Sequence, residues 1–99
     1  MAAVTVAELL VGVSLADGKR RPRRQMFVDS VLEAVAVLPY DVRVAQAHAQ
    51  LLTAVRRSGR PRGAHDLIIA ATAVSSHRAV LTADATGFQD LPGVQVTQR

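Results

Sequence analysis

The sequence contains no cysteine, which excludes both a disulfide framework and a zinc site built on thiolates. Aromatic residues make up only 3% of the chain, so a platform of rings that stacks on single-stranded bases is not expected. No apolar run approaches the ~20 residues of a membrane-spanning helix, and the N-terminus lacks the basic region of a secretory signal. We therefore expect no membrane association, and the lack of cysteine favours a reducing cytoplasm.

The residues that are present favour one small α/β domain. The chain has 99 residues, 49% of them hydrophobic, and the apolar ones are mostly Ala, Val, Leu and Ile. This composition is typical of helices packed over a buried parallel sheet. The length suffices for one small domain, which we expect to span residues 1–99.

Hydrophobic periodicity and turn residues predict helices that alternate with short strands. Thr5 is expected to cap the first helix, and Asp41 the third. The predicted order is a strand end at 1–4, a helix over 6–16, a basic loop at 17–24, a helix from 22 or 23 to 34, a strand at 35–40, a helix from 41 to 57, a loop at 58–63, a buried helix over 63–74, and strands at 79–82 and 94–97. Only two or three strands are found, so the parallel sheet is thin.

The three histidines are not predicted to bind a metal. His48 lies on the inward stripe of the third helix, where we expect a half-buried side chain with a hydrogen-bond partner. His65 and His77 have no partner at the spacing of a metal site, and we expect both to be surface or capping residues.

Positive charge is concentrated in two arginine-rich clusters. The net charge is +4, and nine of the twelve basic residues lie in these clusters: Lys19, Arg20, Arg21, Arg23 and Arg24, then Arg56, Arg57, Arg60 and Arg62. The guanidinium group binds phosphate bidentately, so the clusters favour nucleic acid as a ligand. Two solvated loops that only aid solubility are the alternative.

Three acidic residues lie in places where a carboxylate is unusual. Asp66 stands at the start of an almost wholly apolar run, where it is either a first-turn helix acid or a ligand. Glu8 is the only charge between Met1 and Asp17. It either closes a capping box with Thr5 or needs a cation or another partner, and both interpretations stay open. Asp84 follows a strand's C-terminal end, as either a turn residue or part of a ligand site.

If these three carboxylates converge, they need a cation to offset their repulsion. Hard oxygen ligands of this kind select Mg²⁺ or Mn²⁺. Such a site activates water and neutralises charge on a phosphodiester, while arginine loops hold the flanking phosphates. This is nuclease chemistry, and it follows from the residue types.

Three ordered segments carry a family resemblance: Thr5–Gly12, Gly59–Ala71 and Leu81–Asp84. Together they resemble PIN-domain ribonucleases, above all the VapC toxins of bacterial type II toxin–antitoxin systems. The resemblance implies a three-layer α/β/α fold with a short parallel sheet, and an endoribonuclease neutralised by a cognate antitoxin. It also implies Mg²⁺ or Mn²⁺ held by Glu8, Asp66 and Asp84, with Thr82 as a supporting hydroxyl.

From the basic clusters we take Arg20, Arg21, Arg60 and Arg62 as the residues that contact RNA. We expect a homodimer or a toxin–antitoxin hetero-oligomer as the assembly.

The sequence departs from the family at its start. VapC-like chains begin with a central strand that carries an Asp-Thr-Ser or Asp-Thr-Asn motif, and nothing like it precedes Met1. We therefore expect an N-terminally incomplete PIN domain that depends on a partner chain, self-association or the missing segment for stability. The alternative function is a catalytically impaired PIN fragment that acts only as an antitoxin-binding or self-associating module. A basic nucleic-acid binder whose acids are all helix caps is a third possibility.

Overall fold

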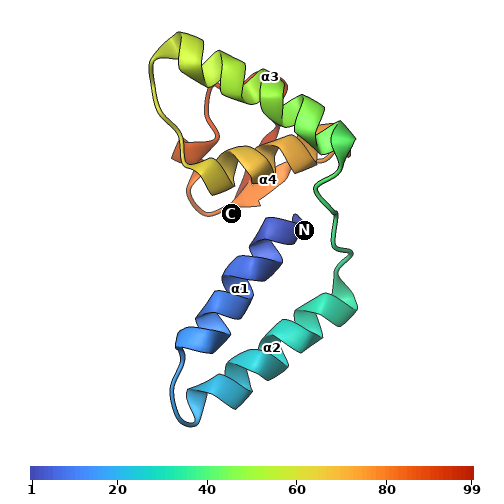
Figure 1. The fold of residues 1–99 in the computed structure, drawn as a ribbon, viewed down its shortest axis with the longest axis vertical. Coiled ribbons are helices and arrows are strands. Elements are labelled where there is room, and N and C mark those ends of the chain that lie inside the picture. Colours follow the sequence, from blue (N-terminus) through green and yellow to red (C-terminus); the bar gives the residue numbers. More distant parts are fainter. The chain divides into compact units, whose positions relative to one another are not determined.

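A computed structural model describes all residues of the chain, and helices dominate it (Figure 1). The chain divides into two compact units, unit 1 (Met1–Pro39) and unit 2 (Tyr40–Arg99). None of the helices combines the length and the apolar character needed to cross a membrane. The elements are α1 (Ala3–Leu15), α2 (Arg20–Ala34), α3 (Val42–Ser58), α4 (Ala64–Ser75), β1 (Val80–Thr82), the 3-10 helix η1 (Ala85–Gly87) and β2 (Val96–Gln98).

Unit 1 is a hairpin of α1 and α2, which lie side by side in Figure 1. Arginines of α2 hold the end of α1: Arg21 Nε donates to Ala16 O at 3.0 Å, and Arg24 Nη1 donates to Gly12 O at 3.4 Å. These carbonyls lie at or near the C-terminal end of a helix, where backbone acceptors lack partners within the helix. The arginines of α2 therefore have a structural role that the sequence did not indicate.

The predicted start of unit 1 was wrong. α1 begins at Ala3, so Thr5 lies inside the helix and Glu8 is its sixth residue. The capping box between these two side chains is therefore excluded, because both belong to the body of the helix. The strands predicted at 1–4 and 35–40 are reduced to one parallel bridge, Ala2 with Leu38, which is too short to form a strand pair.

The first basic cluster also differs from the prediction. α2 begins at Arg20, which places most of the cluster in the first turns of a helix rather than in a loop. Pro22 is tolerated as the third helical residue, because the first backbone N–H groups of a helix have no intrahelical partner. Arginine is itself a good helix former.

The first helix of unit 2 has its predicted cap, and its histidine has a hydrogen-bond partner. The Asp41 side chain accepts a hydrogen bond from the Val44 N–H at 3.0 Å, which confirms Asp41 as the cap of α3. Tyr40 Oη lies 2.8 Å from His48 Nδ1, with the two rings at 88° to each other. His48 is half-buried and has a partner, as predicted. α3 ends at Ser58 and is capped by Gly59, whose left-handed φ of 70° suits glycine.

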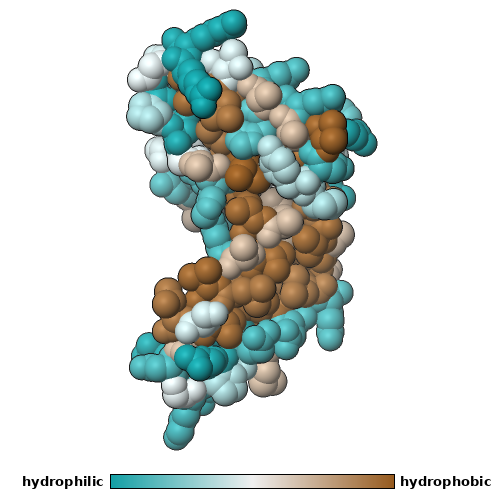
Figure 2. Space-filling view, in the orientation of Figure 1, coloured by the Kyte–Doolittle hydropathy of each residue, from teal (hydrophilic) through white to brown (hydrophobic).

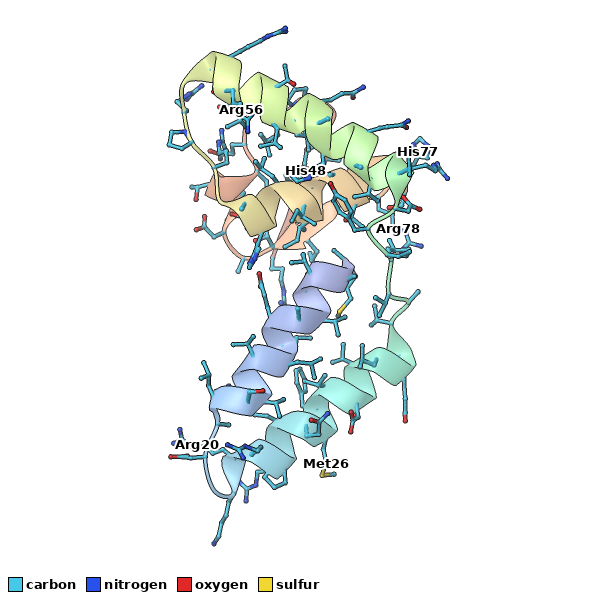
Figure 3. All side chains as sticks on the ribbon, viewed as in Figure 1. Arg20, Met26, His48, Arg56, His77 and Arg78 are labelled. Atoms are coloured by element: carbon cyan, nitrogen blue, oxygen red, sulfur yellow. The ribbon has the colours of Figure 1, made fainter.

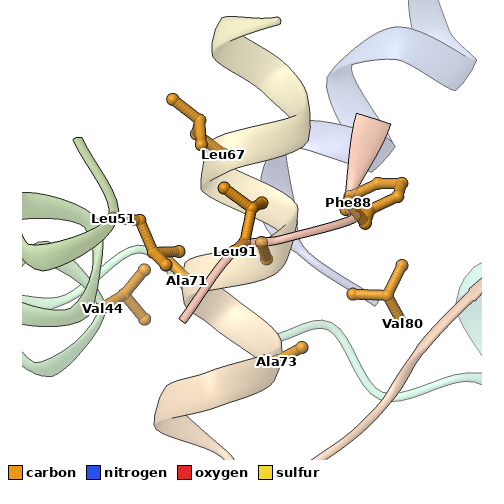
Figure 4. Packing of buried hydrophobic residues seen from close by; sticks show 9 residues of the cluster. Val44, Leu51, Leu67, Ala71, Ala73, Val80, Phe88 and Leu91 are labelled. Carbon is orange, nitrogen blue, oxygen red and sulfur yellow. The ribbon is translucent and has the colours of Figure 1, made fainter. Parts of the chain in front are cut away.

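The hydrophobic core of unit 2 lies where α3 packs against α4 and the segments after it (Figure 4). Ala70 and Ala71 of α4 are completely buried, because a helix with small side chains can approach its neighbours closely. This confirms α4 as the buried helix predicted over residues 63–74. The buried cluster consists of Val44, Leu51, Leu67, Ala70, Ala71, Ala73, Val80, Phe88 and Leu91.

Helix α4 ends in a left-handed turn at His77, which has a φ of 56° (Figure 3). The His77 N–H donates to Val74 O at 3.2 Å, and the Arg78 N–H donates to Ala73 O at 2.8 Å. This is the hydrogen-bond pattern of a Schellman motif, in which glycine usually holds the position of His77. The prediction that His77 is a surface or capping residue is therefore confirmed.

The sheet of unit 2 has two parallel strands, with Val80 paired to Val96 and Thr82 to Gln98. Both strands lie close to their predicted positions. Val80 of β1 is buried but Leu81 is 65% exposed, so only one face of the strand is covered. One face of so small a sheet has too few neighbours to cover it. The chain is thus a helix-rich α/β protein with a short parallel sheet.

Candidate active site

Asp66 is the third residue of α4, in the first turn and half-buried. Gly63 precedes the helix in extended conformation, so the chain turns sharply into the apolar run. The partial positive charge of the first backbone N–H groups favours an ionised carboxylate here. The predicted place of Asp66 at the helix start is confirmed.

The Asp66 carboxylate lies in a narrow space between two glycines. A Cβ built on Gly87 would stand 2.5 Å from Asp66 Oδ2, whereas one built on Gly63 would stand 3.4 Å away. The first distance is too short for any side chain, and the second is an ordinary contact. The absence of a side chain at Gly87 therefore lets the start of α4 approach η1.

Asp84 is the N-terminal cap of η1. Its Oδ1 accepts hydrogen bonds from the Thr86 hydroxyl at 2.6 Å and from the Thr86 N–H at 3.0 Å. The hydroxyl, and then the N–H, lower the pKa of Asp84 below its ordinary value, because both donors stabilise the charged form. The side chain is exposed. Asp84 is thus an ionised carboxylate just beyond the C-terminal end of β1, as predicted.

Thr82 supports the backbone of Asp84. Its hydroxyl donates to Asp84 O at 3.0 Å and accepts from the Asp84 N–H at 3.1 Å. The sequence predicted a supporting hydroxyl at this position. The structure places it on the main chain of Asp84 and gives no contact to the carboxylate.

Arg62 joins the second basic loop to the same turn. Its Nη1 donates to Thr86 O at 3.0 Å. Asp66, Asp84 and Arg62 therefore all border the η1 turn of unit 2, although they come from three separate segments.

Glu8 lies in unit 1, on the exposed side of α1. It lines a hollow between the two helices together with Arg24 and Phe27. The chain contains no group of three or more His, Asp or Glu side chains placed to hold one metal ion. The convergence of Glu8 with the two aspartates of unit 2 stays a prediction.

The four arginines predicted to contact RNA have different surroundings. Arg20 is exposed at the loop end of α2, where Figure 3 labels it. Arg21 is engaged with the carbonyls of Ala16 and Ser14, and Arg62 with the turn at η1. Arg60 is exposed in the loop after α3. Their contact with RNA stays a prediction.

Sequence reasoning missed two residues of this site, Thr86 and Gly87. The available signal was the run Asp84-Ala85-Thr86-Gly87, in which an acid precedes a hydroxyl residue by two positions. That spacing is typical of a turn in which an Asp side chain accepts bonds from the backbone two residues on. The contact of Gly87 with Asp66 joins distant segments, so no local signal could reveal it.

The geometry so far defines an α/β protein with an acidic site beside the carboxyl end of a parallel strand. A family model described as the PIN domain matches residues 1–94. The chain therefore belongs to the PIN-domain family, and its relatives within that family are VapC-type ribonucleases.

Two curated relatives illustrate the similarity. The chain is 39% identical over 93 residues to the VapC ribonuclease Y4jK of Sinorhizobium fredii, covering 90% of this chain and 66% of that protein. It is 28% identical over 94 residues to the ribonuclease VapC of Rickettsia bellii, covering 94% of this chain and 70% of that protein. The matched segment thus spans about two thirds of each relative.

Solved structures agree in fold. The DNA-bound VapBC of Salmonella typhimurium superposes with a TM-score of 0.90 at 27% identity, covering 98% of this chain and 72% of that one. VapBC-5 of Mycobacterium tuberculosis gives a TM-score of 0.87 at 33% identity, covering 99% and 79%. Both structures confirm a PIN-like α/β fold with a short parallel sheet.

Proposed function

We propose that the chain is a metal-dependent endoribonuclease toxin of the VapC type, neutralised by a cognate antitoxin. The observation that carries the proposal is the arrangement around η1, where the Asp66 carboxylate lies against Gly87 and Asp84 caps the same short turn. Two carboxylates beside a strand end supply hard oxygen ligands of the kind that metal-dependent phosphodiester hydrolysis uses. The names of the relatives, which include ribonucleases VapC, support the same activity.

The donor set fits Mg²⁺ or Mn²⁺. Asp84 is exposed and its pKa is lowered, so it is charged at neutral pH. Asp66 offers a second carboxylate, and Glu8 is proposed as the third. These oxygens are hard ligands, and the chain has no thiolate that would favour a softer metal. When bound, such a cation would activate water and offset the charge of the phosphodiester.

The residues of the chain would divide the remaining work. Thr86 holds Asp84 in its charged state, and Thr82 fixes the backbone of Asp84. Gly87 leaves room for the Asp66 carboxylate. Arg20, Arg21, Arg60 and Arg62 are proposed to hold the RNA phosphates.

Asp66→Asn tests the proposal. This change keeps the size of the side chain and removes its charge. We expect Mn²⁺-dependent RNA cleavage to fall by about 100-fold or more, since altering even the partners of metal ligands costs about 10- to 100-fold. Asp17→Asn, an exposed loop variant, is the control. Equal cleavage by the Asp66 variant and the control would show that the assigned site is wrong.

Exposed apolar side chains on unit 1 support a protein partner. Leu10, Val11 and Leu15 of α1 are 40%, 54% and 81% exposed, and Figure 2 shows hydrophobic residues gathered over α1. Apolar patches of this kind mark interaction sites. We propose the antitoxin as this partner, within a homodimer or a hetero-oligomer in the cytoplasm. The solved relatives include VapBC-5, a member of the VapBC family of toxin–antitoxin systems.

The second candidate function is a PIN fragment that binds antitoxin or associates with itself but does not cleave RNA. The exposed apolar side chains of unit 1 favour it, because they suit a protein partner whether or not RNA is cleaved. Calorimetry with Mn²⁺ separates the two functions: no metal binding together with tight antitoxin binding would support the fragment.

A further inference from the structure

We propose that Arg62, assisted by Arg60, forms a subsite for one phosphate of the RNA backbone beside the two carboxylates. The inference rests on the proposed ribonuclease function, because it names how that site would hold its substrate. It goes further by ranking the arginines, which the sequence treats as equivalent.

Arg62 is preorganised by its contact with η1. One guanidinium N–H is used in the 3.0 Å hydrogen bond to Thr86 O, and four N–H groups remain for a ligand. Thr86 is also the residue that holds Asp84. The arginine and the carboxylate are therefore fixed to one residue, and a phosphate bound by Arg62 would lie next to the acidic site.

A small hollow opens beside this arginine. Its cavity volume is about 30 Å³, too small for a base but suited to part of a phosphate group. The Arg60 N–H donates to Ser58 Oγ at 3.2 Å, so the loop backbone is held where the hollow begins. The lining residues are Ala54, Val55, Ser58, Arg60, Arg62, Asp90 and Leu91.

The charges of the hollow favour an anion. Arg60 and Arg62 contribute two positive charges, and Asp90 contributes one negative charge. No ion pair joins Asp90 to either arginine, so neither guanidinium is neutralised by it. Asp90 has a left-handed φ of 63°, a conformation that Asn adopts at least as readily. Asp90→Asn therefore removes the opposing charge without disturbing the backbone.

The test measures binding in EDTA, without metal and thus without cleavage. A fluorescein-labelled single-stranded RNA is titrated with each variant, and its anisotropy is followed at several salt concentrations. We expect Arg62→Ala to bind about tenfold more weakly, because a charge-assisted contact is lost. The slope of log K against log salt should become less negative by about 0.7, the value for one phosphate contact on single strands.

Arg57→Ala is the matched control. Arg57 is an exposed arginine of α3 that lines a different groove, and its loss removes the same charge. We expect it to change the RNA affinity by less than about twofold, as a general charge effect. Equal losses for Arg57→Ala and Arg62→Ala would overturn the subsite.

Two further variants keep the proposal testable if Arg62→Ala loses its fold. Asp90→Asn should tighten RNA binding by about two- to threefold, since it removes a repulsive charge. Arg62→Lys should bind more weakly than the wild type, because an ammonium group cannot hold Thr86 O and fork onto a phosphate. Unchanged binding in both variants would also overturn the proposal.

The outcomes separate this inference from the proposed function. Loss of RNA binding in Arg62→Ala, without Mn²⁺-dependent cleavage by the wild type, would support the subsite and contradict the nuclease. Cleavage that depends on Asp66, together with equal RNA binding by the Arg62 and Arg57 variants, would support the nuclease and contradict the subsite.

Discussion

Asp66 Oδ2 lies where a Cβ on Gly87 would be only 2.5 Å away, so the carboxylate at the start of α4 fits because Gly87 has no side chain. The two residues are far apart in the sequence and belong to different elements. Their contact brings the Asp66 helix to the turn that Asp84 caps. The candidate site of unit 2 depends on this approach, and it makes Gly87 a positioning residue.

Gly87→Ala should displace the Asp66 carboxylate. We expect Mn²⁺ affinity, measured by calorimetry, to fall about 10- to 100-fold, as for other residues that position metal ligands. The matched control is Gly63→Ala, whose Cβ would meet the same oxygen at an ordinary 3.4 Å. A Gly87→Ala protein with the metal affinity of the control would show that the Asp66 carboxylate can move without loss.

Thr86→Val should raise the pKa of Asp84 toward its ordinary value, because the hydroxyl is the strongest cause of the lowering. A lowered pKa in the folded state contributes stability above the ordinary pKa of about 3.9, and this stability is lost as the pH falls through the lower folded pKa. The variant should therefore be less stable than the wild type at neutral pH, and the difference should disappear in acid, where Asp84 is protonated in both proteins. NMR titration of the Asp84 carboxyl carbon measures the shift.

Thr97→Val, on the exposed side of β2, is the control for this titration. It should leave the Asp84 titration unchanged. Identical titration curves for the wild type and Thr86→Val would show that the Thr86 hydroxyl does not cause the lowered pKa of Asp84.

Arg21→Ala should destabilise the hairpin of unit 1. The side chain donates to Ala16 O and Ser14 O near the end of α1, and one lost hydrogen bond costs about 1 kcal/mol. Arg23→Ala removes the same charge from an exposed neighbouring position and should have little effect. Chemical denaturation followed by circular dichroism compares the two, and equal free energies of unfolding would exclude the capping role.

His77→Gly should stabilise the protein by about 1 kcal/mol, because a non-glycine residue pays for the left-handed conformation at this position. Arg78→Gly is the control, and we expect it to change the stability in the opposite direction. Its φ is not in the left-handed region, so the extra freedom of glycine in the unfolded chain should lower stability. Thermal unfolding of both variants checks the signs, and a destabilised His77→Gly would mean that the imidazole makes a compensating interaction.

The sequence by itself determined the features that depend on neighbouring residues. The apolar run after Gly63 fixed α4 and placed Asp66 in its first turn. Asp41 capped α3, and Asp84 followed a strand end, because caps and turns are made by side chains that bond to backbone groups two or three residues away. The resemblance to PIN-domain ribonucleases came from the same short segments and was confirmed for residues 1–94.

Only the tertiary structure decided how these segments meet. Arg62 reaches Thr86 across 24 residues, and Gly87 makes room for Asp66 across a similar separation. Such contacts depend on how α4 and η1 pack around the buried core, and local periodicity carries no information about that packing. For the same reason the sequence misplaced the start of α1. Thr5 followed by Glu8 is a good capping pattern, but the helix begins at Ala3 and takes both residues into its body.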